Sequence, residues 1–294
     1  MEKYPFKIPN ANFEFVTDDS ETKGSRKKRK VIVLDNNIAD SSKEAVFKYE
    51  LYNCTESCSE KIAYEIAKVL GYPCAKIELA KDENQIVGVI NYNFIKKRSG
   101  EEHTDFGNFF NINSENRKTM YTLEKVHELL DELDVKLYNK FIRIMFFDAL
   151  IGETDRHEEN WGILRTYDDG KVLLEISPLY DNGCSLLREF KNYTFASKYY
   201  DGARKLEDYI NRGTVILRNA ETGKCFKHFE LISKLKDENP TTLRKESEKL
   251  NLLDNDTINR IVDYIPDELM IEKHKTIVKQ YIKLRKERLC EICG

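Results

Sequence analysis

The sequence predicts an α+β fold in two lobes, a small β-rich lobe with one helix followed by a larger, mainly helical lobe. Three observations lead to this prediction. Short β-branched and aromatic runs fill roughly the first 95 residues, one helical pattern interrupts them, and helical periodicity dominates the later part of the chain. We therefore divide the chain into lobes 1–95 and 96–294. With 294 residues, 40% of them apolar, the chain can bury a sizeable core.

The first lobe contains four runs with the composition of strands. Between the second and third runs lies one helical pattern, for which Ser57 and Ser59 are candidate N-caps and Gly71 and then Pro73 are stop signals. The four predicted strands are Val31–Leu34, Ala45–Tyr49, Ala75–Leu79 and Ile86–Tyr92. This pattern predicts a small sheet with a single inserted helix.

The second lobe begins after a polar stretch, 96–119. Apolar residues then recur at helical spacing from Leu123 to Met145, and the run 141–152 is apolar enough for a buried helix that ends at Gly152. Helical patterns return from about residue 225 to the end of the chain. The second lobe is therefore predicted to be mainly helical.

Composition excludes several classes of protein. The 48 basic and 51 acidic residues leave a net charge of −3, so we expect no direct nucleic-acid binding and no general attraction to anionic lipid. No apolar run approaches the roughly 20 residues of a membrane span, and 1–15 lacks a signal-peptide core. We expect a soluble, cytoplasmic protein, with export by a route that needs no classical signal peptide left open.

The seven cysteines are scattered, which favours reduced thiols over a disulfide framework. Cys290 and Cys293 have the spacing of half a zinc site or a redox pair. No second pair of Cys or His lies near them in the sequence, so we interpret them as thiols of a frayed C-terminal tail.

The densest polar cluster follows the predicted buried helix. Asp155 is followed five residues later by Asn160 and some twenty residues further by Asp181. This arrangement suits phosphoryl transfer, because one Asp can orient a hydroxyl and accept its proton while an amide oxygen and a second carboxylate ligate Mg²⁺. The alternative is an ordinary turn in which His157 is a structural histidine.

A resemblance makes the prediction more specific. The motif Gly152-x-Thr-Asp-Arg-His-x-x-Asn160, followed by Ser177-Pro-Leu-Tyr-Asp181, resembles the catalytic and metal-binding segments of the HipA-like serine/threonine kinases, including their smaller CtkA-type members. Asp-Arg-His-x-x-Asn is also similar to the catalytic loop of phosphatidylinositol kinases. The resemblance covers about 20–190 and is weaker in the C-terminal helices.

The resemblance implies a two-lobed protein-kinase-like fold that binds ATP and Mg²⁺ between the lobes. It implies that Asp155 is the catalytic base and that Asn160 and Asp181 are the Mg²⁺ ligands. It places His157 at the phosphates, with Tyr180, beside Asp181, as a further residue of the nucleotide site.

The first lobe should then supply a lysine for the phosphates. Lys48 lies inside a predicted strand among apolar neighbours, where a lysine is costly unless it is paired or faces a ligand. The alternative is an edge-strand lysine that faces solvent. Its carboxylate partner is expected on the following helix, where we choose Glu60 over Glu65. Ser57-x-x-Glu60 is also a capping box, which leaves the pairing open.

Two further segments are assigned to the nucleotide. The basic stretch 23–30 contains Gly24 and Ser25, whose backbone N–H groups can approach phosphates, although a solvated turn or a nucleic-acid patch is also possible. Asn93 and Phe94 follow the last strand and fit a linker that holds adenine.

Asp105-Phe-Gly spells a familiar metal motif, but it precedes the catalytic loop in a polar linker with no apolar strand, so we interpret it as a coincidence.

We therefore predict a serine/threonine protein kinase that transfers the γ-phosphoryl group of ATP to a protein substrate, including itself. A phosphatidylinositol or small-molecule kinase is an alternative, because the same parts position any hydroxyl. A kinase-scaffold binding module with an antitoxin-like partner is a second alternative. It is weakened by the presence of every catalytic residue, and by the short stretch of about 20 residues before the phosphate loop.

Overall fold

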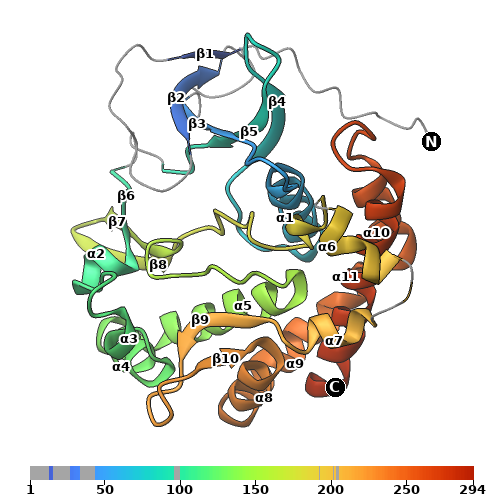
Figure 1. Ribbon diagram of the computed structural model, residues 1–294. Helices are drawn as coiled ribbons and strands as arrows, with labels where there is room; N and C mark the ends of the chain where they lie inside the picture. The colour runs from blue at the N-terminus through green and yellow to red at the C-terminus, as the bar shows by residue number, and fades with distance from the viewer. Residues whose placement is uncertain are drawn as a thin grey trace.

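The computed structural model describes residues 13–15, 27–33, 44–95, 100–191, 193–200, 202 and 205–294. It confirms the predicted α+β fold, with a small β-sheet formed by the N-terminal part of the chain and a larger helical part formed by the rest (Figure 1). Gly24 and Ser25, in the first half of the basic stretch 23–30, lie outside the described residues, so their contacts with phosphate remain a prediction.

The N-terminal sheet has five antiparallel strands in the order β1-β2-β3-β5-β4. The strands are β1 (Phe13–Phe15), β2 (Lys28–Val33), β3 (Glu44–Tyr49), β4 (Ile77–Lys81) and β5 (Val87–Tyr92). The four predicted runs correspond to β2, β3, β4 and β5, with ends that differ by at most three residues. One face of the sheet buries a separate small cluster that includes Val31, Phe47 and Ile90.

The single helix of this part, α1 (Glu56–Leu70), ends as predicted at Gly71, which adopts a left-handed φ of 71°. Its start differs from the prediction, because the N-cap is Thr55 and both predicted caps lie inside the first turn. The carboxylate of Glu50 instead accepts the Ser57 N–H at 2.9 Å. A side chain from outside the helix therefore accepts one of the free N–H groups at the start of α1, which a serine N-cap was expected to accept.

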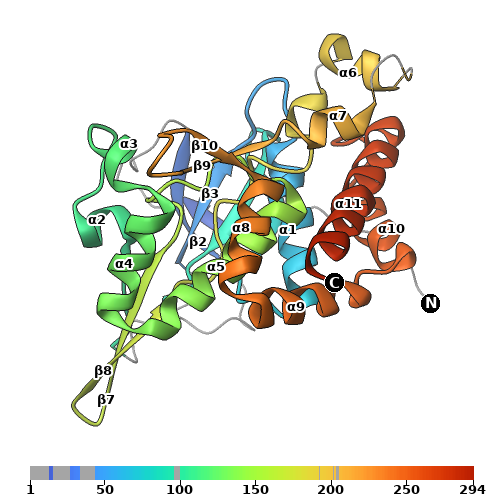
Figure 2. The same ribbon diagram turned by 90° about the horizontal axis from the view of Figure 1, so that it is seen from below.

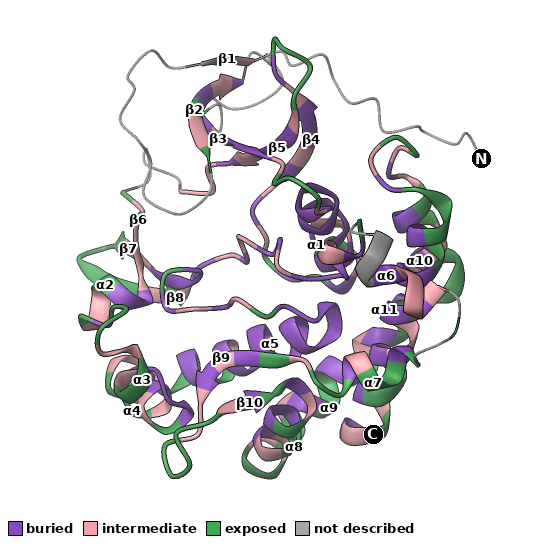
Figure 3. Cartoon of the chain, in the orientation of Figure 1, coloured by how far each residue is buried: buried purple, intermediate pink, exposed green. Residues whose placement is uncertain are grey.

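The helical part is built around α5 (Val135–Ile151), which is buried along most of its length (Figure 3). α4 (Leu123–Leu133) precedes it, and Asp134 separates the two helices by adopting an extended backbone and accepting the Lys136 N–H at 2.9 Å. α5 ends at Gly152, as predicted, with a φ of 71°. The other helices of this part are α6 (Tyr193–Tyr200), α7 (Leu206–Ile210), α8 (His228–Glu238), α9 (Pro240–Lys249), α10 (Asn255–Asp263) and α11 (Glu272–Cys293), with short 3₁₀ turns at Arg188–Lys191 and Leu250–Leu252.

Several elements were not predicted. The polar stretch before residue 120 forms a strand and two short helices, and two further small sheets lie in the helical part. The β7–β8 hairpin turns through Asp169 and Gly170, both with positive φ, and projects from the body of the molecule (Figure 2). These elements are β6 (Glu102–Asp105), α2 (Phe106–Phe110), α3 (Arg117–Met120), β7 (Gly162–Asp168), β8 (Lys171–Ile176), β9 (Thr214–Arg218) and β10 (Cys225–Lys227).

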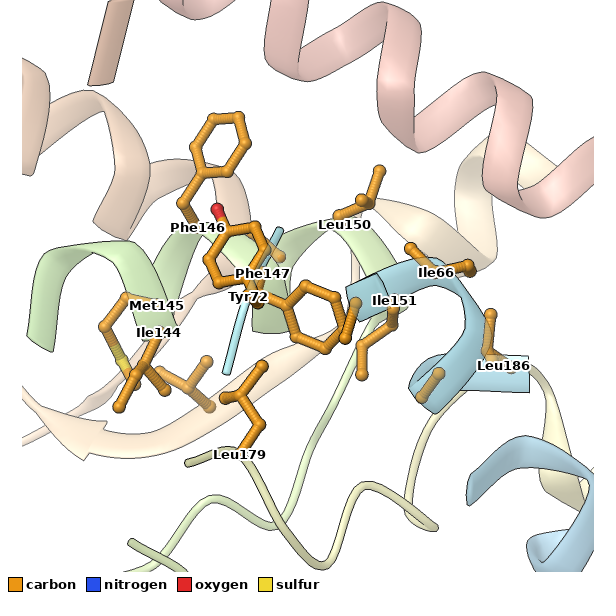
Figure 4. Packing of buried hydrophobic residues seen from close by; sticks show 14 of the residues in the cluster. Ile66, Tyr72, Ile144, Met145, Phe146, Phe147, Leu150, Ile151, Leu179 and Leu186 are labelled. Atoms are coloured by element: carbon orange, nitrogen blue, oxygen red, sulfur yellow. The ribbon is translucent and has the colours of Figure 1, made fainter. Parts of the chain in front are cut away.

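One hydrophobic core joins the two parts. It runs from α1 and the inner face of the sheet into the helical part, and Figure 4 shows Ile66 of α1, Tyr72, Leu179 and Leu186 gathered around residues of α5 such as Phe147. Leu179 and Leu186 flank the segment that contains Asp181. The core therefore fixes the backbone on both sides of a predicted site residue.

Cys290 and Cys293 both lie within the last turns of α11, and Cys293 is buried. The interpretation of this pair as a frayed tail is therefore wrong, because Cys293 packs into the main core.

Within the described ranges, no group of three or more His, Cys, Asp or Glu residues is arranged to hold a metal ion. No described helix is long and apolar enough to cross a membrane.

Candidate active site

A cavity of about 1030 Å³ lies between the N-terminal sheet and the helical part. Strands β2, β3 and β5 form one wall, and the loop after α5 together with the segment after β8 forms the other. The wall of the cavity includes eight of the predicted site residues: Lys48, Asn93, Phe94, Asp155, His157, Asn160, Tyr180 and Asp181. Residues that are up to 133 positions apart in the sequence are thus brought to one cleft.

Lys48 is 8% exposed and lies on β3. Its Nζ donates to Glu60 Oε1 at 3.2 Å and to Asp181 Oδ1 at 2.9 Å. Asn91 on β5 donates to the other oxygen of Glu60 at 3.1 Å, which fixes the orientation of that carboxylate. The ammonium group is therefore held between a helix of the sheet part and a loop of the helical part.

The two carboxylates considered as partners of Lys48 have different surroundings. Glu65 pairs with Lys61 at 2.8 Å and with Lys68 at 3.2 Å, both on its own helix. Glu60 is buried and contacts Lys48. The structure thus places the carboxylate that we chose, Glu60, beside Lys48, and the capping box does not form because Ser57 is not the N-cap.

The loop after α5 is ordered by short hydrogen bonds around Asp155. Its backbone N–H donates to Glu153 Oε1 at 2.8 Å, and its carbonyl accepts from the His157 N–H and the Asn160 side-chain Nδ2, both at 2.8 Å. Because the amide nitrogen of Asn160 is used in this way, its amide oxygen points to the other side of the side chain. This arrangement suits a metal ligand in the cleft.

Arg156 anchors the same loop to the core and was missed by the sequence reasoning. It is 2% exposed, and its guanidinium forms a bidentate pair with Asp148 of α5 at 2.8 and 3.0 Å. The remaining donors reach the carbonyl oxygens of Asn160 at 2.9 Å and Tyr180 at 2.7 Å, and Asn182 Oδ1 at 2.6 Å. One buried side chain therefore ties the loop after α5 and the Asp181 segment to one helix.

Asp181 itself adopts a left-handed backbone with a φ of 55°, which is uncommon for a residue other than glycine. The preceding Tyr180 donates its hydroxyl to the Glu159 carbonyl at 3.0 Å, and this contact joins the two loops at the cleft. Cys184 lies three residues further on, and its Sγ is 3.7 Å from Asp155 Oδ2. Burial raises the pKa of this thiol, so it stays protonated and can donate to the carboxylate.

His157 also lines the cleft, and its Nδ1 accepts the Glu159 N–H at 3.2 Å. In the neutral ring the proton is therefore on Nε2, which is then a donor.

At the linker, the Asn93 N–H donates to the Glu44 carbonyl at 3.0 Å and the Asn93 side chain accepts the Ile95 N–H at 2.9 Å. The ring of Phe94 stacks at 5.7 Å on that of Tyr180, so an aromatic pair lies at this end of the cleft.

Asp105 has a different environment from the one expected. It is the last residue of β6, lines the cleft, and caps α2 by accepting the Asn108 N–H at 2.7 Å. The sequence reasoning missed this strand because β6 is polar and is held by backbone pairing with β7 rather than by apolar side chains. Lys28 and Lys30 of β2, which belong to the basic stretch 23–30, also line the cleft.

Comparison with known protein families agrees with the family that the motif suggests. A model of the HipA-like C-terminal domain matches residues 21–246. The chain belongs to the HipA-like family. The family suggested by the catalytic motif is therefore confirmed.

Two solved structures are similar to this HipA-like chain. The kinase CtkA, a proinflammatory protein of Helicobacter pylori, matches with a TM-score of 0.75 and 22% identity over 95% of this chain and 94% of that chain. This likeness confirms the two-lobed kinase-like fold. A chain of the complex of Shewanella oneidensis HipA, HipB and operator DNA matches with a TM-score of 0.41 and 14% identity over 95% of this chain and 67% of that one. No curated protein matches significantly.

Proposed function

We propose that this HipA-like protein is an ATP- and Mg²⁺-dependent serine/threonine kinase that phosphorylates protein hydroxyls, including its own. The observation that carries the proposal is the convergence of Lys48, Asp155, Asn160 and Asp181 on one cleft from three separate segments of the chain. Family membership and the fold shared with a kinase support the same reaction class. A cleft of about 1030 Å³ is ample for a nucleotide.

The sheet wall would bind the phosphates of ATP. Lys48 is positioned by Glu60, and an ammonium group held in this way can donate to phosphate oxygens with little loss of side-chain freedom. Lys28 and Lys30 of β2 add positive charge to the same wall. The backbone of Gly24 and Ser25 is expected to complete the phosphate loop.

The residues present fit a Mg²⁺ ion that is shared with a nucleotide. Asn160 and Asp181 offer an amide oxygen and a carboxylate, and Mg²⁺ in nucleotide sites is held by one or two such groups plus substrate phosphates. The absence of a larger cluster of potential metal ligands among the described residues agrees with such a shared site. When bound, the ion would neutralise charge on the β- and γ-phosphates.

The helical wall would act on the acceptor. Asp155 orients the acceptor hydroxyl and accepts its proton as the bond from the acceptor oxygen to the γ-phosphorus forms. The bond between that phosphorus and the bridging oxygen breaks, and ADP leaves. Anchoring of the loop by Arg156 keeps the Asp155 carboxylate in place without a rearrangement during the reaction.

The test is phosphoryl transfer from labelled ATP by wild type and by Asp181→Asn. Asparagine tolerates the left-handed φ of this position, whereas Asp181→Ala would add backbone strain to the loss of charge. We expect label on Ser or Thr in the wild type and a loss of at least about 10²-fold in the variant, with an unchanged melting temperature. Asp169→Asn, at the exposed tip of the β7–β8 hairpin, is the matched control.

Normal turnover by folded Asp181→Asn would contradict the metal assignment. A lowered melting temperature without selective loss of transfer would make Asp181 a structural turn residue. Label that appears only on a lipid headgroup or a small-molecule hydroxyl would overturn the assignment of a protein acceptor.

A further inference from the structure

A second cavity of about 850 Å³ adjoins the cleft on the side of the helical part. Cys184 lines both cavities, and Thr154, which lines the second, is the chain neighbour of Asp155, which lines the first. The Thr154 hydroxyl donates to the Cys184 carbonyl at 3.1 Å, so the boundary between the cavities is itself ordered. The second cavity thus opens next to the carboxylate that would receive the acceptor hydroxyl.

The charged residues that line this second cavity are mostly basic. They are Arg188, Lys198, Arg212 and one acid, Glu189. Glu189 accepts a hydrogen bond from the Tyr209 hydroxyl, and burial raises the pKa of its carboxyl group. The wall therefore carries a positive excess directly beside the proposed reaction centre.

Arg212 is the basic group best placed to bind a ligand. Its Nε donates to the Asp208 carbonyl at 2.9 Å and one terminal nitrogen donates to the Tyr199 hydroxyl at 3.3 Å. Among the described residues, no carboxylate forms an ion pair with it. By contrast, Arg188 is paired with Glu56 at 3.2 Å. The guanidinium of Arg212 is therefore held by neutral acceptors, and no carboxylate of the described residues compensates its charge.

The rest of the lining suits a polypeptide segment. The tyrosines Tyr199, Tyr209 and Tyr281 form part of the wall, with the rings of Tyr199 and Tyr209 5.7 Å apart in an edge-to-face arrangement. Aromatic rings with polar tips bind extended chain through apolar contact and hydrogen bonds. Residues of α6, α7 and the start of β9 line the cavity, and Figure 1 shows α6 and α7 on the same side of the molecule as α11.

We propose that this second cavity is the acceptor site and that it selects a polypeptide segment with a negatively charged side chain near the reacting hydroxyl. The charge can come from Asp or Glu or from a phosphorylated residue, since a guanidinium binds either oxyanion through charge-assisted hydrogen bonds. The inference rests on the proposed kinase function, and it adds the class of acceptor that the enzyme prefers.

The experiment uses the full-length protein, labelled ATP and short peptides with a single unmodified serine. The residues that flank the serine are Ala, Asp, phosphoserine or Lys. For wild type we expect kcat/KM to be roughly threefold to tenfold higher for the anionic peptides than for the Ala peptide, mainly through a lower KM. Comparison of the Asp and phosphoserine series separates the two sources of charge.

The variants Arg212→Gln and Lys198→Gln should reduce that preference while the rate with the Ala peptide changes little. Arg212→Glu should shift the preference toward the Lys peptides. The matched control is Arg244→Gln, an exposed arginine of α9 whose partner Glu248 lies one turn away. It should keep the preference of the wild type. The Ala peptide also detects a variant whose fold is disturbed, and Lys198→Gln tests the cavity if Arg212 variants do not fold.

Equal kcat/KM for all peptides, in a protein that still labels itself, would overturn the anionic preference while leaving the kinase function in place. An anionic preference that survives in both Arg212→Glu and Lys198→Gln would overturn its assignment to this cavity. Absence of transfer to any peptide and to the protein itself would overturn the proposed kinase function and the acceptor site with it.

Discussion

The two walls of the cleft are held in different ways. On the sheet wall, Lys48 is positioned by ion pairs, one of which crosses the cleft to the partly exposed Asp181. On the helical wall, Asp155 lies in a loop that the buried Arg156 fastens to Asp148 in the middle of the core. The difference suggests that substitutions on the sheet wall change nucleotide binding at small cost to folding. Substitutions beneath the helical wall should change both.

The largest effect is expected for Arg156→Leu. The substitution leaves Asp148 buried without its partner and removes the bonds to two loops, so we expect the free energy of unfolding to fall by about 3–5 kcal/mol. Lys48→Met should cost less, because Asp181 remains in contact with solvent and the buried Glu60 keeps the hydrogen bond that Asn91 donates. Urea denaturation of both variants measures the difference.

A double variant sharpens this comparison. Arg156→Leu combined with Asp148→Leu removes both charges of the buried pair and should recover part of the lost stability, since no isolated charge remains. Equal destabilisation by Arg156→Leu and Lys48→Met would show that the two walls are anchored alike.

Asp155→Asn should affect chemistry without affecting the fold. We expect phosphoryl transfer to fall by about 10²-fold or more, the usual scale for the loss of a general base. Nucleotide affinity should be kept, because the opposite wall supplies the phosphate contacts. The measurement is the autophosphorylation rate together with ATP affinity, with Asp169→Asn as the control for substitution of an exposed aspartate.

A transfer rate within a fewfold of wild type in Asp155→Asn would remove Asp155 from the catalytic role. Loss of ATP binding in the same variant would instead place it on the nucleotide side of the cleft.

Glu153, in the loop of the helical wall, makes the stability of the protein depend on pH. Burial raises the pKa of its carboxyl group to about 8, against an ordinary value of 4.5, so the folded protein keeps a proton that the unfolded chain releases above pH 4.5. This group therefore stabilises the fold at low pH, and that contribution is lost as pH rises toward 8. The glutamine of Glu153→Gln cannot ionise, so this variant does not lose that stability. The difference in free energy of unfolding, variant minus wild type, should therefore rise by about 1–2 kcal/mol between pH 6 and 7.5.

Urea midpoints at the two pH values provide the measurement. Glu207→Gln, at an exposed position in the first turn of α7, serves as the control and should show no such trend. A constant difference between Glu153→Gln and wild type would mean that the buried carboxyl group is ionised throughout this range.

The smallest effect concerns Glu60 and Glu65 of α1. Glu60→Gln weakens the positioning of Lys48, and we expect transfer to fall about fivefold to tenfold, mainly through weaker ATP binding. Glu65→Gln is the matched variant on the same helix, and it should leave transfer unchanged because Glu65 pairs with Lys61 and Lys68 rather than with Lys48. A larger loss in Glu65→Gln than in Glu60→Gln would reverse the assignment.

Local features of the fold were predictable from the sequence where they depend on neighbours in the chain. The strand runs of the sheet and the ends of α1 and α5 at Gly71 and Gly152 follow from side-chain pattern and backbone preference. The polar strand β6 was missed because it is stabilised by pairing with β7, which leaves no apolar alternation to detect.

The sequence by itself determined the family and the order of the site residues along the chain, since Asp155 and Asn160 lie in one short motif and Asp181 in a second motif some twenty residues later. Only the tertiary structure decided that Lys48 meets both Glu60 and Asp181, that Arg156 is buried against α5, and that a basic cavity adjoins Asp155. The physical reason is that an ion pair between distant segments depends on how helices and sheet pack together. Local propensity places a charged residue on an element, and packing decides which opposite charge it meets.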